Sequence, residues 1–120
     1  MELDSIDYKN EKILIVDDDP YIRDTLEKLL SAINLSSTSA GNGRDALNLL
    51  SKGEYTVVLT DMKMPGMDGM ELISRVSSNF DISVIAMTGH LEGYKYLDVI
   101  NAGASDFIKK PFGIEELEAK

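Results

Sequence analysis

Short, continuously apolar runs that recur between segments of helical spacing constrain the fold of this chain most. Residues 13–16 and 57–59 are apolar throughout and rich in β-branched side chains, which is typical of strands buried on both faces. Residues 84–87 and 107–108 have the same character. Strands that alternate with helices predict βαβ units, and therefore an α/β domain in which helices cover both faces of a parallel sheet.

The segments between these runs show the spacing and the start signals of helices. Pro20 suits the first turn of a helix, and the aspartate before it is a good N-cap residue. Residues 37–40 form a weaker strand candidate, too polar for the centre of a sheet and therefore expected at an edge. Apolar residues at helical spacing predict five helices. The residues are Ile22, Leu26, Leu29, Leu30 and Ile33 in the first; Ala46, Leu47 and Leu50 in the second; Leu72, Ile73 and Val76 in the third; Tyr94, Leu97 and Ile100 in the fourth; and Ile114 and Leu117 in the fifth.

Length and charge limit the functions open to the chain. Its 120 residues suit one domain, which we expect at residues 12–120 after a polar leader at residues 1–11. A net charge of −9 argues against direct binding to nucleic acids or to anionic membranes. The chain has no cysteine, which excludes thiolate metal sites, and no apolar run that could span a bilayer. We therefore expect a cytoplasmic protein.

Polar side chains follow four of the five predicted strands. Ligands of open parallel sheets bind beyond the carboxyl ends of the strands. Asp17, Asp18 and Asp19 follow the first strand, Asp61 follows the third, Thr88 the fourth, and Lys109 and Lys110 the fifth. No reactive side chain follows the second predicted strand, which is the most polar one and is expected at an edge of the sheet.

Carboxylates that converge at one edge of a sheet require a cation. If the first and third strands are neighbours, Asp61 meets Asp17 and Asp18, and a like-charge pair 4 Å apart costs roughly 4 kcal/mol at an effective dielectric near 20. Carboxylate oxygens are hard ligands that suit Mg²⁺. Together with a hydroxyl and an ammonium group, such a site favours phosphoryl transfer, with Asp61 as the nucleophile.

Each of these features also has an ordinary structural interpretation. Asp17–Asp19 alone would be an acidic turn with an N-cap, Asp61 a turn residue and the lysine pair a solvated one. Five methionines could indicate a soft-metal site, but packing around a loop is the favoured interpretation; they are Met62, Met64, Met67, Met70 and Met87. A calcium loop is excluded because its third position would be Lys63. The hypothesis depends on all four groups falling at strand ends.

This combination resembles the receiver domain of bacterial two-component response regulators. The resemblance runs from about Lys12 to Leu117 and is carried by residues 13–20 (ILIVDDDP), 61–69 (DMKMPGMDG), 87–89 (MTG), 103–104 (GA) and 110–112 (KPF). It implies a flavodoxin-like (βα)5 fold, a doubly wound, five-stranded parallel sheet of order 2-1-3-4-5. The last helix is expected to be short or truncated, because the sequence ends at Lys120.

The resemblance also implies roles for the acidic residues. Asp61 is the expected acceptor of a phosphoryl group from a phosphohistidine. Asp18, Asp61 and the main-chain carbonyl of Lys63 are the expected direct ligands of Mg²⁺, and Asp17 is expected to hold the ion through water.

Three further residues receive roles in the same way. Lys110 is expected to pair with Asp61 and then with the phosphoryl oxygens, and Thr88 to hydrogen-bond to one of these oxygens. Phe107 matches the aromatic switch residue, whose ring turns inward when the threonine moves. The Lys110–Pro111 peptide bond is expected to be cis.

The leading hypothesis is therefore a phosphoacceptor switch, not a turnover enzyme. A sensor histidine kinase or a phosphotransfer protein is the expected partner, and an output domain beyond residue 120 or a homodimer remains open. The alternative is an Mg²⁺-dependent phosphohydrolase with an aspartate nucleophile. Such sites commonly carry a second aspartate where this chain has Lys63. A phosphate-independent interaction domain is a third hypothesis, weakened because every expected site residue is present.

Overall fold

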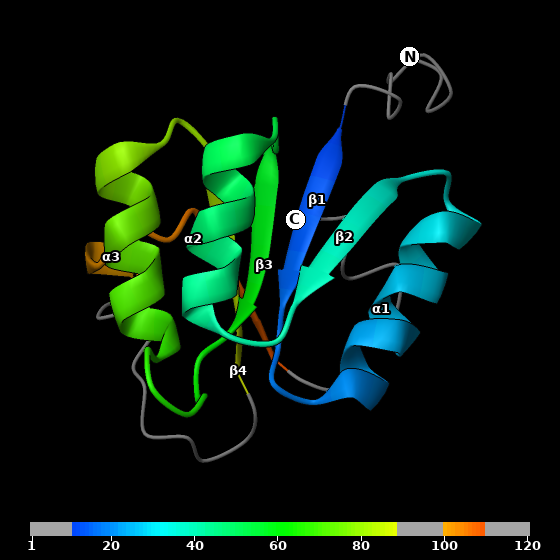
Figure 1. The fold of residues 1–120 in the computed structure, drawn as a ribbon, viewed down its shortest axis with the longest axis horizontal. Helices are drawn as coiled ribbons and strands as arrows, with labels where there is room; N and C mark the ends of the chain where they lie inside the picture. The colour runs from blue at the N-terminus through cyan, green and yellow to red at the C-terminus, as the bar shows by residue number, and fades with distance from the viewer. Residues whose placement is uncertain (1–10, 89–99, 110–120) are drawn as a thin grey trace.

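The chain folds into a five-stranded parallel sheet of order β2-β1-β3-β4-β5, flanked by helices (Figure 1). A computed structural model describes residues 11–88 and 100–109. Within them lie β1 (Lys12–Val16), α1 (Pro20–Ala32), β2 (Ser36–Ala40), α2 (Gly43–Lys52), β3 (Val57–Asp61), α3 (Gly69–Asn79), β4 (Ser83–Thr88) and β5 (Asp106–Lys109). The predicted strand order is confirmed.

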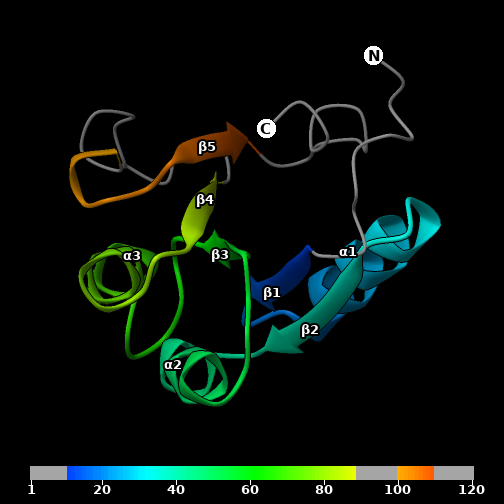
Figure 2. The same ribbon diagram turned by 90° about the horizontal axis from the view of Figure 1, so that it is seen from above.

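The helices cover opposite faces of the sheet: α1 lies on one side, and α2 and α3 lie on the other (Figure 2). Side chains alternate between the two faces along each strand. In β1, Leu14 and Val16 pack with α2 and α3, whereas Ile13 and Ile15 pack with α1. Because both faces are buried, β1 and β3 contain consecutive apolar residues over most of their length, which explains the continuous pattern in the sequence.

The edge position of β2 agrees with its composition. This strand contains three serines and a threonine in five residues, and only its last residue, Ala40, is buried. It pairs with β1 on one side only, so the backbone N–H and C=O groups on its other side point away from the sheet. The prediction that the most polar strand would lie at an edge is confirmed.

Local signals set the helix starts as the sequence indicates. Asp19 is the N-cap of α1, where its side chain accepts a hydrogen bond from the Tyr21 backbone N–H at 2.9 Å. Pro20 opens the helix, where its missing N–H costs nothing. On the other face, Leu72, Ile73 and Val76 of α3 are buried, as their spacing predicts. The methionines Met62 and Met64 pack in the core, which confirms the packing interpretation.

Several sequence-based expectations lie outside the described residues. They are the leader as far as residue 10, the fourth helix apart from Ile100, the fifth helix, and the cis peptide bond before Pro111. Within residues 11–88 and 100–109, none of the helices combines the length and the apolar character that crossing a membrane requires.

Candidate functional site

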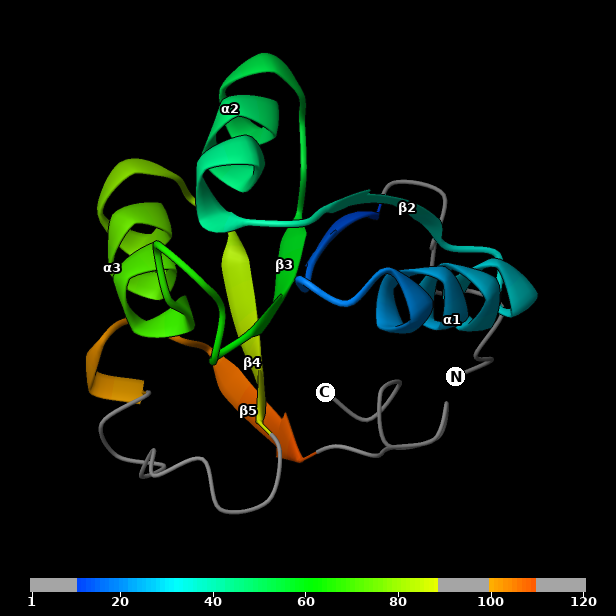
Figure 3. The ribbon, with the colours of Figure 1, turned by 60° about the horizontal axis from the view of Figure 1, so that its bottom comes forward.

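The pairing of β1 with β3 brings two aspartates to the same level of the sheet. Val16 is the register partner of Thr60, so Asp17 and Asp61, the next residues, leave adjacent strands side by side. Figure 3 shows the two connections that follow these strands, which emerge next to each other at the carboxyl edge. This edge is where the sequence predicts a site.

Asp17, Asp18 and Asp61 form one acidic cluster there. One carboxylate oxygen of each lies within 4.8 Å of the others. The side chains of Asp17 and Asp61 are almost fully buried, with 1% and 5% of their surfaces exposed, and Asp18 is exposed to solvent. The cluster therefore has two buried carboxylates and one that is exposed to solvent, so a cation can approach it from the side of Asp18.

Backbone hydrogen bonds orient the two buried carboxylates. The Asp19 backbone N–H donates to Asp17 Oδ1 at 3.0 Å, and the Met62 backbone N–H donates to Asp61 Oδ1 at 2.9 Å. Each carboxylate is thus tied to the residue one or two positions after it. Such bonds limit rotation of the two side chains.

The connection between β3 and α3 is packed tightly against the end of the strand. The Gly69 backbone N–H donates to the Met62 carbonyl oxygen at 2.8 Å. A Cβ atom at Gly69 would lie 2.5 Å from both the Asp61 carbonyl oxygen and Met62 Cα, so only glycine permits this approach. Gly66, with a φ of 76°, makes the turn in the middle of the connection. Lys63 is exposed within it.

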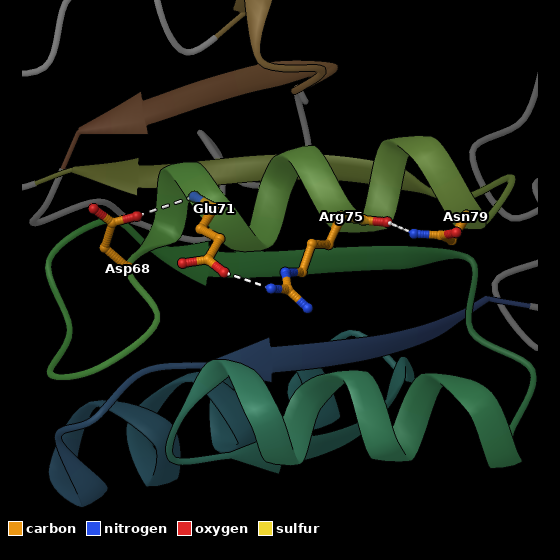
Figure 4. A network of polar contacts seen from close by, with 4 residues as sticks. All are labelled: Asp68, Glu71, Arg75 and Asn79. Atoms are coloured by element: carbon orange, nitrogen blue, oxygen red, sulfur yellow. Dashed lines mark hydrogen bonds and ion pairs between the residues drawn. The ribbon is translucent and has the colours of Figure 1, made fainter.

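Polar contacts on α3 fix the far end of the same connection (Figure 4). Asp68 is the N-cap residue and accepts a hydrogen bond from the Glu71 backbone N–H at 3.0 Å. On the exposed side of the helix, Glu71 forms an ion pair with Arg75 at 2.8 Å. Together with Gly69, this cap fixes where the loop after Asp61 ends.

The donor set of the cluster fits a divalent cation. Three carboxylates with oxygens within 4.8 Å repel one another, by about 3.5 kcal/mol per pair at an effective dielectric near 20. All three groups offer oxygen, the ligand type of Mg²⁺ and Ca²⁺. A cation held between them would offset this repulsion, and the exposed side leaves room for water ligands.

The structure brings together some of the predicted site residues. Asp17, Asp18 and Asp61 meet, and the backbone of Lys63 lies in the loop that follows Asp61. Thr88 is the last residue of β4, next to β3 in the sheet, and pairs with Lys109 of β5. Phe107 lies in β5 and pairs with Ala86. Lys110 falls outside the described residues.

Two residues at the site were missed by the sequence reasoning. Arg23 donates a hydrogen bond from Nη1 to the Asp17 carbonyl oxygen at 2.7 Å, and Gly69 permits the close packing after Asp61. Signals for both exist: an arginine in the first turns of a helix can reach back to the preceding loop, and a glycine directly after an N-cap aspartate suggests close backbone packing.

Comparisons with known proteins agree with this geometry. Residues 13–120 match the family model of the response regulator receiver domain. The chain is 37% identical over 109 residues to the two-component response regulator ARR11 of Arabidopsis thaliana, covering 89% of this chain and 21% of that protein. It is 36% identical over 108 residues to the DNA-binding transcriptional regulator NtrC of Escherichia coli K12, covering 89% and 23%. The chain thus spans about a fifth of the length of these two relatives.

Solved structures show the same fold. A response regulator receiver domain protein from Clostridium thermocellum superposes with a TM-score of 0.85 at 27% identity, covering 91% of this chain and 89% of that one. A CheY-like receiver domain protein from Methanospirillum hungatei superposes with a TM-score of 0.79 at 33% identity, with the same coverage. The chain belongs to the response regulator receiver domains of two-component signalling, a family of phosphoacceptor switches and not of turnover enzymes.

Proposed function

We propose that Asp61 accepts a phosphoryl group from a phosphohistidine, carried by a sensor histidine kinase or by a phosphotransfer protein. In this step a carboxylate oxygen of Asp61 attacks phosphorus, an acyl-phosphate O–P bond forms, and the P–N bond breaks as the imidazole leaves with the bonding electron pair. The observation that carries this proposal is the acidic cluster, in which Asp61 is buried beside Asp17 and Asp18 at the carboxyl edge.

We assign the cation site to the same cluster. Asp18, Asp61 and the main-chain carbonyl of Lys63 would hold Mg²⁺ directly, and Asp17 would hold it through water. When bound, Mg²⁺ offsets the negative charge of the carboxylates and of the incoming phosphoryl oxygens. The hydrogen bonds from the backbone N–H groups of Asp19 and Met62 orient the carboxylates of Asp17 and Asp61.

The remaining site residues are assigned the roles that the resemblance to the receiver domain family implies. Lys110 would pair with Asp61 and then with the phosphoryl oxygens, and Thr88 would donate a hydrogen bond to one of these oxygens. Movement of Thr88 would let Phe107 turn inward and remodel the surface formed by the fourth helix, β5 and the fifth helix. Phosphorylation would bias an existing two-state equilibrium in this way.

The switched surface would regulate a partner or an attached output domain. The two curated relatives are far longer than this chain, and one of them is described as a DNA-binding transcriptional regulator. Because the chain carries a net charge of −9, we assign any nucleic-acid contact to another domain and not to this one. Phosphoryl transfer from the kinase is expected to take place in the cytoplasm. Formation of a homodimer through the switched surface is a further possibility to test.

Phosphorylation by a small donor tests the acceptor directly. The protein is incubated with acetyl phosphate and Mg²⁺, and its intact mass is measured. We expect one phosphoryl adduct, lost in Asp61→Asn and lost when EDTA removes the divalent cation. Asp24→Asn is the matched control, because Asp24 lies on the exposed side of α1, paired with Lys28 at 3.0 Å. An adduct that persists in Asp61→Asn would contradict the assignment.

Lys63 is proposed to set the lifetime of the phosphorylated form. Its side chain is exposed two residues after the acceptor, where it can shield the acyl phosphate from water. We expect Lys63→Asn to lose phosphate faster than the unmodified protein after removal of the donor. Equal rates of loss would refute the shielding role.

A further inference from the structure

Arg23 holds both ends of the loop that carries the acidic residues after β1. Its guanidinium Nη1 donates to the Asp17 carbonyl oxygen at 2.7 Å, and its backbone N–H donates to the Asp19 carbonyl oxygen at 3.1 Å. The backbone bond belongs to the first turn of α1, whereas the side-chain bond reaches back to the end of β1. The loop that includes Asp18 is therefore fixed from both sides by one residue.

The guanidinium is in turn confined by the connection between β2 and α2. A Cβ atom at Gly41 would lie 3.2 Å from Arg23 Nη1 and 3.6 Å from Cζ, so the group lies directly against this glycine. Immediately before it, the Ala40 carbonyl oxygen accepts a hydrogen bond from the Asp17 backbone N–H at 3.2 Å. The backbone of Asp17 is thus held through its N–H by β2 and through its C=O by Arg23.

We infer that Arg23 is a positioning residue for the cation site. By fixing the Asp17 carbonyl, it sets the directions in which the carboxylates of Asp17 and Asp18 leave the loop. The inference rests on the proposed function, since it assumes that these carboxylates hold a divalent cation. The bond ends on a main-chain oxygen, so the arginine fixes the loop without using a carboxylate oxygen that the ion needs.

Two roles of Arg23 predict opposite results. If only the positive charge of Arg23 mattered, removing it would strengthen divalent-cation binding, because the guanidinium would no longer repel the ion. If positioning matters, removal weakens binding, because the carboxylates lose their preset geometry. Groups that orient metal ligands typically contribute about 10- to 100-fold in affinity. We expect the weakening to prevail, at roughly tenfold, because the bond is made to the main chain.

The experiment measures Mn²⁺ binding by electron paramagnetic resonance and Mg²⁺ binding by calorimetry, without any phosphoryl donor. Arg23→Gln removes the charge and shortens the reach, and Arg23→Lys keeps the charge with a single donor centre. Arg75→Gln is the matched control, because Arg75 pairs with Glu71 on the exposed side of α3. Thermal unfolding in EDTA verifies that each variant is folded.

Gly41→Val provides a second, independent perturbation. It removes no charge and no hydrogen-bonding group, but it forces the guanidinium to move, and the backbone at Gly41 accepts a side chain because its φ is not positive. We expect weaker Mn²⁺ binding in Gly41→Val and a smaller further effect of this change in the Arg23→Gln background. Such non-additivity is the sign that both changes act on one contact.

The outcomes test the positioning role of Arg23 separately from the proposed cation site. Roughly tenfold weaker binding in Arg23→Gln, partial recovery in Arg23→Lys and unchanged binding in Arg75→Gln support the inference. Equal or tighter binding in Arg23→Gln, or additive effects of the Gly41 and Arg23 changes, overturn the inference alone. If the unmodified protein binds neither Mn²⁺ nor Mg²⁺, the proposed function itself fails. Should Arg23→Gln not fold, Gly41→Val alone still tests the contact.

Discussion

The acidic cluster should make the protein less stable without a cation and more stable with one. Asp18→Asn tests this, because it removes one charge and keeps the shape of the side chain. At the 4.8 Å that bounds the oxygen separations, a like-charge pair costs about 1 kcal/mol in a water-like dielectric and about 3.5 kcal/mol at an effective dielectric of 20. Since Asp18 is exposed, we take a value close to the water-like limit for each of its two pairs, with Asp17 and with Asp61, or about 1–2 kcal/mol in total.

In EDTA, Asp18→Asn is therefore expected to unfold later than the unmodified protein. A domain of this size shifts its melting temperature by roughly 4 °C per kcal/mol, so the midpoint should rise by about 4–8 °C. The order should reverse when Mg²⁺ is added. A cation present at a hundred times its Kd adds about 2.7 kcal/mol to the folded state that binds it, and the variant has lost one of the binding carboxylates.

The assay is thermal and urea unfolding followed by circular dichroism, first in EDTA and then across a Mg²⁺ titration at constant ionic strength. Asp24→Asn is the control for the loss of one negative charge elsewhere. Its exposed pair with Lys28 contributes at most about 0.5 kcal/mol, so its Mg²⁺ response should equal that of the unmodified protein. If Asp18→Asn is less stable in EDTA, or if Mg²⁺ shifts both proteins equally, the cluster is not a cation site.

Three further expectations concern the scaffold of the site and can be measured by urea unfolding. Gly69→Ala should destabilise by about 1–3 kcal/mol, because its Cβ would meet the Asp61 carbonyl oxygen at 2.5 Å, and unchanged stability would show that the loop after β3 adapts freely. Leu72→Ala, at a fully buried position of α3, should cost about 2–5 kcal/mol with an unchanged m-value, whereas a loss below 1 kcal/mol would mean that the core refills. Asn42→Ala should cost about 1 kcal/mol through loss of the 2.8 Å hydrogen bond from the Asp45 backbone N–H, and Asn42→Ser, which keeps an acceptor oxygen at the N-cap, should retain most of that stability.

The elements that sequence reasoning places correctly are those in which local pattern and tertiary burial agree. Residues 13–16 form most of β1 because a strand buried on both faces needs an apolar residue at every position. Pro20 and the aspartate before it mark the start of α1, because a helix start is satisfied locally by its own cap. The polar strand β2 lies at the edge because a strand that is only partly buried can carry polar side chains.

The contacts within the site could not be predicted in this way. That Asp17 lies beside Asp61 depends on the pairing of Val16 with Thr60, two residues far apart in the chain whose register has no local signal. The strand order came from the family resemblance, and periodicity alone did not supply it. The hydrogen bond from Arg23 to Asp17 and the close backbone approach at Gly69 depend on distances between loops. The hydrophobic pattern of the sequence carries no information about these distances.

The register between Val16 and Thr60 has a consequence for how far such proteins can diverge. Main-chain hydrogen bonds align the two acidic residues, so the apolar side chains beneath them can be exchanged for others of similar volume without moving the chemistry. A single inserted or deleted residue in either strand would, by contrast, turn one carboxylate to the opposite face. We therefore expect these strands to tolerate substitutions but not insertions or deletions, in agreement with a backbone that superposes with a TM-score of 0.85 on a protein at 27% sequence identity.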